Sequence, residues 1–427
     1  MEGDGRTMAN IRPFRGVRPA EHLVSQIAAL PYDVYSSREA RKVVEENPLS
    51  FLKIDRAETQ FPEETDMYSQ QVYDRARDTL VEMETSGQFV QDKEPCYYIY
   101  AQTMGKRTQT GLVCAVSIDD YLENVVKRHE NTREDKELDR IRHVDTCSAH
   151  TGPIFLAYRG RREVKEVIET VEKERALYDF VSDDGVRHQV WKIEACGQRE
   201  KMTAILAEID SLYIADGHHR AASAVKVGLM RRHENPGYDG TEEFNYFLAV
   251  LFPAEELRIY DYNRVIHKLR EGVAEHLPEE LEPYFTVTKY SEKTIEEAGT
   301  EGVRPSEKGE ISMYLKGQWY RLKAKKEICP DDPVEGLDVS VLQNVVLGPM
   351  LGISDPKTDE RIQFVGGIRG LAELMRIVDR EEHAVAFAMY PTSMGELMEV
   401  ADAGRLMPPK STWFEPKLRS GLLIHKF

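Results

Sequence analysis

The stretch Ser211-Leu-Tyr-Ile-Ala-Asp-Gly-His-His-Arg-Ala-Ala-Ser-Ala-Val225 is the part of the chain whose local fold is read most directly from sequence. Its apolar start, Ser211 to Ala215, predicts a short buried strand. From His218 to Arg232, small and apolar residues recur at helical spacing, which predicts a helix. Asp216 and Gly217 are therefore expected at the turn between a strand and a helix N-terminus.

This turn has the chemistry of an anion site. A helix N-terminus presents unpaired N–H groups and the positive end of the helix dipole, and Gly217 lets the backbone approach a ligand closely. Arg220 can add a bidentate fork, and His218 and His219 can donate hydrogen bonds or titrate. The alternative is that Asp216 only caps the helix and pairs with Arg220. The density of polar residues at one turn favours a functional site that binds phosphate.

A second polar cluster lies upstream, where His129 and Glu130 precede Asn131-Thr132 and a charged helix predicted from Arg133 to His143. A glutamate before a helix can be a plain capping carboxylate. It can also be a general base held beside a substrate hydroxyl group. The spacing leaves both roles open.

Composition limits the classes of partner. The chain has 427 residues and a net charge of −17, which disfavours broad nucleic-acid binding because phosphate backbones need a basic face. No apolar run approaches the roughly 20 residues of a membrane span, and the start of the chain lacks the apolar region of a signal peptide. We expect a cytoplasmic protein with no membrane or nucleic-acid partner.

Strands that alternate with helices predict a mixed α/β fold of the α+β class. Cys96–Thr103 and Thr108–Ile118 form an expected hairpin around Met104-Gly-Lys-Arg107, and Ser50–Ile54 resembles a strand. We expect four segments, listed here: an N-terminal segment, 11–110; a core that contains the predicted phosphate site, 111–268; a small acidic α+β lobe, 269–335; and a C-terminal α/β segment that completes the pocket, 336–427.

Two turn-rich regions hold further candidate residues. Arg12, Tyr32 and Asp33 lie near the N-terminus, and Lys410, Ser411 and Thr412 lie in a loop near the C-terminus. Polar side chains in such loops either face a ligand or make local turn contacts, and the sequence leaves both readings open.

Several blocks are similar to those of the bacterial and archaeal family known as domain of unknown function 1015, over nearly the whole chain. They are Ile11-Arg-Pro-Phe-Arg-Gly16, Pro31-Tyr-Asp-Val34, Asn47-Pro48, Arg128-His-Glu-Asn-Thr132, Ala215-Asp-Gly-His-His-Arg220, Tyr390-Pro-Thr392 and Met407-Pro-Pro-Lys-Ser-Thr412.

A more distant resemblance covers residues 112–230. Val116-Ser-Ile-Asp-Asp-Tyr121, His129-Glu130 and Ile214-Ala-Asp-Gly-His-His-Arg-Ala-Ala222 resemble the ParB/sulfiredoxin-like fold, and within it the free-serine kinases of archaea and of siderophore biosynthesis. About 85 residues separate Glu130 from Asp216, more than the compact kinases have.

The resemblance to the kinases implies a role for each matching residue. Glu130 corresponds to the carboxylate that activates the serine hydroxyl, with His129 beside it in the catalytic group. The implied nucleotide-binding residues are Gly217, His218, His219, Arg220 and Thr132. Asp216 would contact the substrate or Mg²⁺. Arg12, Tyr32, Asp33, Lys410, Ser411 and Thr412 lie outside this resemblance, and we predict from their place in turn-rich loops that they bind the substrate.

These observations predict a kinase that moves a phosphoryl group from ATP or ADP, with Mg²⁺, to free L-serine or a similar small metabolite. One alternative is a ParB-like regulatory protein that binds a nucleotide, although no basic helix-turn-helix follows the motif. Another is a phosphatase acting on a small phosphoester, because both enzyme classes bind the same anion. The sequence leaves a homodimer open.

Overall fold

The structure, a computed structural model, describes residues 8–291, 299–381 and 383–427. The chain divides into two compact units, unit 1 (Met1–Leu257 and Pro416–Phe427) and unit 2 (Arg258–Glu415). The segment boundary expected after residue 110 falls inside unit 1, and those expected after 268 and 335 fall inside unit 2. Residues 292–298 and 382, which belong to two of the expected segments, lie outside the described residues.

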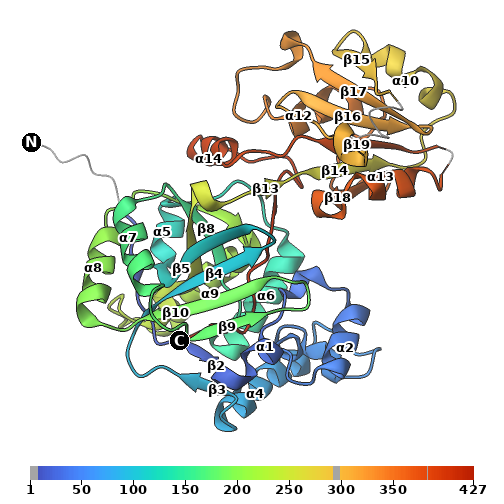
Figure 1. The fold of residues 1–427 in the computed structure, drawn as a ribbon. Coiled ribbons are helices and arrows are strands. Elements are labelled where there is room, and N and C mark those ends of the chain that lie inside the picture. The colour runs from blue at the N-terminus through green and yellow to red at the C-terminus, as the bar shows by residue number, and fades with distance from the viewer. Residues whose placement is uncertain (1–7, 292–298, 382) are drawn as a thin grey trace, which may run out of the picture. The chain divides into compact units, whose positions relative to one another are not determined.

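Both units combine helices with sheets, so the predicted α+β class is confirmed. Among the described residues of unit 1, nine strands form one sheet in the order β6-β11-β8-β12-β5-β4-β10-β9, and β1 pairs with β5 (Figure 1). The pairs β11–β6 and β12–β8 are parallel, whereas the other pairs are antiparallel. The strands are β1 (Ile11–Arg12), β4 (Tyr97–Met104), β5 (Arg107–Ser117), β6 (Val126–Lys127), β8 (Ile154–Tyr158), β9 (Tyr178–Val181), β10 (Arg187–Ile193), β11 (Leu212–Asp216) and β12 (Tyr246–Pro253).

Two short strand pairs complete the β-structure described in unit 1. They are β2 (Val17–Pro19) with β3 (Phe89–Gln91), and β7 (Ala149–His150) with β21 (His425–Lys426). The α-helices of this unit are α1 (Val24–Ile27), α2 (Ser37–Glu46), α3 (Leu52–Asp55), α4 (Gln70–Thr85), α5 (Ile118–Leu122), α6 (Glu134–Cys147), α7 (Arg162–Val171), α8 (Cys196–Leu206) and α9 (His218–Glu234). Its 3-10 helices are η1 (Glu21–Leu23), η2 (Tyr32–Val34), η3 (Ala57–Gln60), η4 (Glu243–Asn245) and η5 (Ala254–Glu256).

The strand, turn and helix predicted around Asp216 are present as β11 and α9. Leu212, Tyr213 and Ile214 are fully buried, and burying each such side chain stabilises the fold by roughly 1.5–3 kcal/mol. Helix α9 packs against β8, β12 and α6, and small residues on its buried face allow the close approach. At Gly228, an added Cβ would lie 2.6 Å from the Phe244 carbonyl oxygen. The packing of β11 and α9 therefore fixes where the turn between them lies.

The hairpin predicted around Met104-Gly-Lys-Arg107 is confirmed as β4 and β5. The strand predicted at Ser50–Ile54 is wrong, because this segment leads into helix α3, Leu52–Asp55. Ser50 Oγ accepts a hydrogen bond from the Leu52 amide, which favours the helical turn. A short apolar run does not by itself distinguish a strand from a buried helix.

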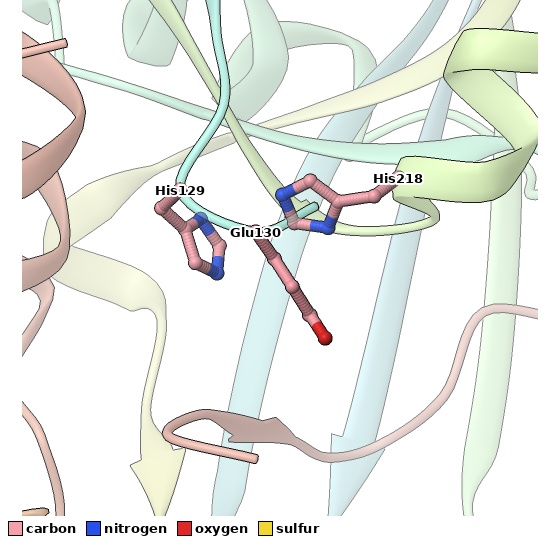
Figure 2. Close-up of side chains that lie close together, drawn as sticks. All are labelled: His129, Glu130 and His218. Atoms are coloured by element: carbon pink, nitrogen blue, oxygen red, sulfur yellow. The ribbon is translucent and has the colours of Figure 1, made fainter. Parts of the chain in front are cut away.

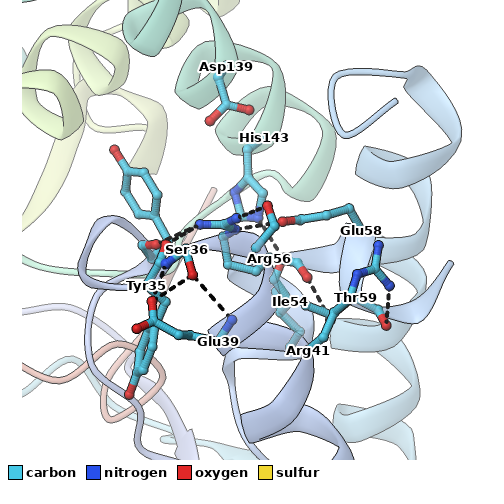
Figure 3. A network of polar contacts seen from close by, with 12 residues as sticks. Tyr35, Ser36, Glu39, Arg41, Ile54, Arg56, Glu58, Thr59, Asp139 and His143 are labelled. Carbon is cyan, nitrogen blue, oxygen red and sulfur yellow. Dashed lines mark hydrogen bonds and ion pairs between the residues drawn. The ribbon is translucent and has the colours of Figure 1, made fainter. Parts of the chain in front are cut away.

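A polar network fixes the N-terminal segment that follows β2 (Figure 3). The Arg56 guanidinium pairs with Glu58 at 2.7 Å, and both side chains are buried. Arg56 also donates to the carbonyl oxygens of Tyr32 at 3.1 Å and Tyr35 at 2.8 Å. At the start of α2, Ser36 forms a capping box with the residue three positions on. The network therefore holds Tyr32, one of the predicted ligand residues, in place.

Within the described residues of unit 2, six strands form an antiparallel sheet in the order β15-β17-β16-β19-β14-β18. They are β14 (Tyr262–Ile266), β15 (Phe285–Lys289), β16 (Glu310–Leu315), β17 (Gln318–Ala324), β18 (Ile362–Gly366) and β19 (Val385–Met389), and the short strands β13 (Ile259–Tyr260) and β20 (Trp413–Phe414) pair separately. The helices are α10 (Val273–Leu281), η6 (Gly299–Val303), η7 (Lys326–Ile328), α12 (Asp338–Leu342), the π-helix η8 (Gln343–Leu347), η9 (Gly367–Arg369), α13 (Leu371–Val378) and α14 (Met394–Asp402).

No helix among the described residues combines the length and the apolar character that crossing a membrane requires.

Candidate functional site

The turn between β11 and α9 has a backbone that only glycine adopts easily. Gly217 is the N-cap of α9 with φ of +95°, in the left-handed region. A Cβ at this position would lie 3.1 Å from Arg220 Nε, so a side chain would press on the guanidinium. Among the described residues, no side chain caps α9, and the first N–H groups of a helix have no partners within it. The turn can therefore present backbone donors to an anion.

Asp216 is an ionised carboxylate held between two cations. Its Oδ2 lies 3.3 Å from Lys417 Nζ and 3.5 Å from Arg220 Nη2. Burial alone would raise the pKa of Asp216, but the charges of Lys417 and Arg220 outweigh it and hold the pKa at about 2. Arg220 also donates to the Pro153 carbonyl oxygen. Asp216 therefore orients Arg220 and Lys417 at the turn.

The structure brings His129 and Glu130 to the start of α9 (Figure 2). One nitrogen or oxygen atom from each of His129, Glu130 and His218 lies within 4.8 Å of the others. The two imidazole rings meet edge to face, with centroids 4.5 Å apart. We call these three residues the His-Glu-His cluster. Its donor set, two imidazoles and one carboxylate, is one that a metal ion could bind.

Burial keeps both histidines of the cluster uncharged. It lowers the pKa of His129 to about 4, although a hydrogen bond to the Ile214 backbone opposes the shift. It also lowers the pKa of His218 well below its usual value, and the neighbouring His129 adds to this effect. At neutral pH both imidazole rings are therefore uncharged, and each has one unprotonated nitrogen that can accept a hydrogen bond or bind a metal ion.

A further contact joins the segment after Glu130 to α9. His219 Nε2 accepts a hydrogen bond from the Arg133 backbone N–H at 2.9 Å. Thr132 donates from Oγ1 to Glu137 at 2.7 Å. Burial lowers the pKa of His219, and the nearby charge of Asp33 opposes this shift. Thr132, His219 and Asp33 therefore belong to the surroundings of the turn.

A pocket in unit 1 borders on Arg220, and its lining includes Tyr32, Asp55, Arg140 and Thr151. The Arg140 guanidinium lies 4.0 Å from the centre of the Tyr32 ring. Thr151 Oγ1 donates to Asp55 at 2.7 Å. Burial raises the pKa of Tyr32 to about 12, so this phenol is protonated at neutral pH. The pocket combines cationic, anionic and hydroxyl groups beside the turn.

Sequence reasoning missed Lys417, Asp55 and Arg140 as residues of this region. Nothing in the spacing of Lys417 distinguishes it from other lysines, because it reaches Asp216 only through the tertiary fold. Asp55 carried a weak signal, since it is a charged residue directly after the apolar Ile54. Arg140 lies within the charged helix predicted from Arg133 to His143, where its position alone does not distinguish it from the other charged residues.

Four of the residues predicted to bind substrate, Arg12, Lys410, Ser411 and Thr412, do not line the pocket that borders on Arg220. The Arg12 guanidinium pairs with Glu243 at 2.8 Å and stacks on the Tyr246 ring at 3.5 Å. Lys410, Ser411 and Thr412 belong to unit 2, where Ser411 donates to the Pro408 carbonyl oxygen at 2.6 Å. Their role in binding substrate stays a prediction.

The Mg²⁺ ion expected at Asp216 fits poorly there. Mg²⁺ requires a nearly octahedral shell of oxygen ligands. Lys417 and Arg220 already neutralise the Asp216 carboxylate, and an added cation would be repelled by both.

Comparison with known proteins gives one family. The sequence profile described as "Protein of unknown function (DUF1015)" matches residues 11–340. No curated protein sequence matches the chain significantly.

Solved structures give distant similarities. SbnI with a C-terminal truncation, from Staphylococcus aureus, has 10% identity and a TM-score of 0.37, and the match covers 71% of this chain and 82% of SbnI. A mutant free serine kinase in complex with ADP has 15% identity and a TM-score of 0.33, with 72% and 88% covered. A conserved hypothetical protein from Pyrococcus furiosus has 16% identity and a TM-score of 0.32, with 74% and 96% covered.

Proposed function

This chain belongs to the DUF1015 family, and we propose that it transfers a phosphoryl group from ATP or ADP to the hydroxyl group of free L-serine or a similar small metabolite. The observation that carries the proposal is the approach of Glu130 to His218, the first residue of α9. A carboxylate and an anion-binding turn are the two parts that phosphoryl transfer to a hydroxyl group needs, and here they lie within one site.

The turn supports the binding of the phosphates. Backbone N–H groups at the start of α9, after Gly217, are available to donate to an anion, and the helix dipole would add to the attraction. Arg220 supplies a guanidinium fork, which Asp216 and the Pro153 carbonyl hold in one orientation. Fixed donors of this kind stabilise the charge of a phosphoryl group in transfer without having to reorganise.

The acceptor would bind at the pocket that borders on Arg220, which would have to widen because its free space of about 20 Å³ holds only about one water molecule. A free amino acid carries a carboxylate and an ammonium group, so it needs a cation and an anion to hold it. Arg140 and Asp55 line the pocket and carry these two charges, and the acceptor would share Arg140 with Asp139, which pairs with it at 2.7 Å, and Asp55 with the Thr151 hydroxyl group. This combination supports a small zwitterionic acceptor such as serine.

In the proposed reaction, Glu130 takes the proton of the acceptor hydroxyl group while the hydroxyl oxygen forms a bond to the terminal phosphorus. The bond from this phosphorus to the bridging oxygen of the nucleotide breaks, and the electron pair leaves with that oxygen. The products are a phosphomonoester and ADP from ATP, or AMP from ADP. Mg²⁺ would supply charge neutralisation on the nucleotide phosphates.

A direct test is to incubate the purified protein with ATP or ADP and with serine, threonine or homoserine, and to identify phosphorylated products by mass spectrometry. The proposal expects a serine phosphomonoester that forms only when nucleotide and acceptor are both present. Tight nucleotide binding with no product from any pairing would reject the kinase and favour a regulatory nucleotide-binding protein. Release of inorganic phosphate from phosphoserine without nucleotide would favour a phosphatase.

A further inference from the structure

The His-Glu-His cluster assembles from two distant parts of unit 1. His129 and Glu130 lie between β6 and α6, and His218 begins α9. Figure 2 shows the three side chains converging, and their nearest candidate ligand atoms lie within 4.8 Å of one another. A tetrahedral ion bound at about 2.0–2.1 Å would hold its ligand atoms roughly 3.4 Å apart, so a small rotation of each side chain would close the site.

His218 has a polar atom with no partner. His218 is only 6% exposed, and its Nε2 is buried and has no hydrogen-bond partner among the described residues. A buried polar atom without a partner costs about 1–3 kcal/mol, so such atoms are rare unless a ligand or ion engages them. Phosphoryl transfer as proposed uses the backbone of this turn and does not account for this ring nitrogen.

His129 is held as metal-binding histidines usually are. Its ring forms a hydrogen bond with the backbone of Ile214 in β11. A histidine that binds a metal through one nitrogen commonly uses the other to bond a backbone carbonyl or a carboxylate, which fixes the orientation of the ring. The strand next to the turn thus orients one of the two imidazoles.

The donor set of the cluster also suits a cation. Glu130 brings a carboxylate to the two imidazoles. Burial leaves the two imidazoles uncharged, which is the form that binds a metal.

We propose that His129, Glu130 and His218 bind one divalent transition-metal ion of the Zn²⁺ type, with at least one coordination position open. Two imidazoles and one carboxylate suit Zn²⁺, Co²⁺ or Mn²⁺, whereas Mg²⁺ prefers oxygen ligands alone. Three protein ligands leave a position for water or for an oxygen atom of a ligand. The inference stands whether or not the chain is a kinase. Glu130 can act as the proposed base only when it does not bind the ion, so Zn²⁺ would inhibit phosphoryl transfer at this site.

The test measures metal binding without nucleotide or acceptor, so its outcome is separate from that of the phosphotransfer assay. The full chain, purified without a polyhistidine tag, is stripped with a chelator and dialysed against Zn²⁺ or Co²⁺. Metal content is measured by mass spectrometry and Co²⁺ coordination by visible absorption. We expect about one equivalent per chain and a rise in the melting temperature with Zn²⁺.

Two variants and a control locate the site. Glu130→Gln and His218→Ala should each weaken Zn²⁺ binding at least about 100-fold, whereas His233→Ala, at the other end of α9, should bind as the wild type does. Glu130→Gln preserves the shape of the side chain, so it decides the test if His218→Ala does not fold. Binding of less than about 0.2 equivalents by the wild type, or unchanged affinity in Glu130→Gln, would overturn the proposal.

Discussion

Gly217→Ala tests whether the β11–α9 turn is the place where phosphate binds. The backbone has φ of +95°, a conformation that costs an L-residue about 1–2 kcal/mol. The new Cβ would also lie 3.1 Å from Arg220 Nε and 3.2 Å from its Cζ. Arg220 cannot move away without disturbing its contacts with Asp216 and the Pro153 carbonyl.

The magnitude follows from these contacts. A charge-assisted hydrogen bond from Arg220 to phosphate is worth about 1.5–3 kcal/mol, so its loss should weaken ADP binding roughly 10- to 100-fold. Gly217→Ala should also lower the free energy of unfolding by about 1–2 kcal/mol through the backbone alone. Isothermal titration with ADP measures the first effect, and urea denaturation measures the second.

Gly185→Ala is the matched control. Gly185 also has a positive φ, +77°, but nothing lies within 4 Å of its added Cβ. This variant should lose a similar free energy of unfolding and bind ADP like the wild type. If Gly217→Ala also bound ADP like the wild type, the phosphates would not lie at this turn, and the proposed phosphate site would be wrong.

Three further predictions concern other parts of unit 1. Glu130→Gln should abolish serine phosphorylation while ADP affinity changes less than about threefold, because the carboxylate acts on the acceptor; wild-type turnover in this variant would remove Glu130 from the mechanism. Arg56→Met should lower the free energy of unfolding by about 3–5 kcal/mol in urea denaturation, because it leaves the buried carboxylate of Glu58 unpaired; a loss under about 1 kcal/mol would show that water reaches this pair. Burial raises the pKa of Asp120 to about 7, so the folded state holds a proton that the unfolded state releases near pH 4. Stability should therefore fall by about 4 kcal/mol as the pH rises from about 4 to about 7, and Asp120→Asn should remove this part of the pH dependence in denaturation series; an identical pH dependence in both proteins would contradict the assignment.

The local elements around the site were predictable because they depend on neighbours in the sequence. The apolar run before Asp216 and the small residues after His218 set a strand and a helix, and Gly217 marks the turn between them. The failed strand at Ser50–Ile54 shows the limit of this reasoning. In that short apolar run, a side-chain hydrogen bond and tertiary packing decided between two conformations that the pattern allows equally.

The sequence by itself therefore determined the α+β class, the strand–glycine–helix turn and the types of residue available for chemistry. Only the tertiary structure decided which of them meet. Glu130 reaches His218 because β6 and β11 are parallel neighbours in one sheet, and Lys417 reaches Asp216 from the far end of the chain. Such contacts depend on strand order and on packing between distant segments, so they cannot be inferred from the spacing of residues along the chain.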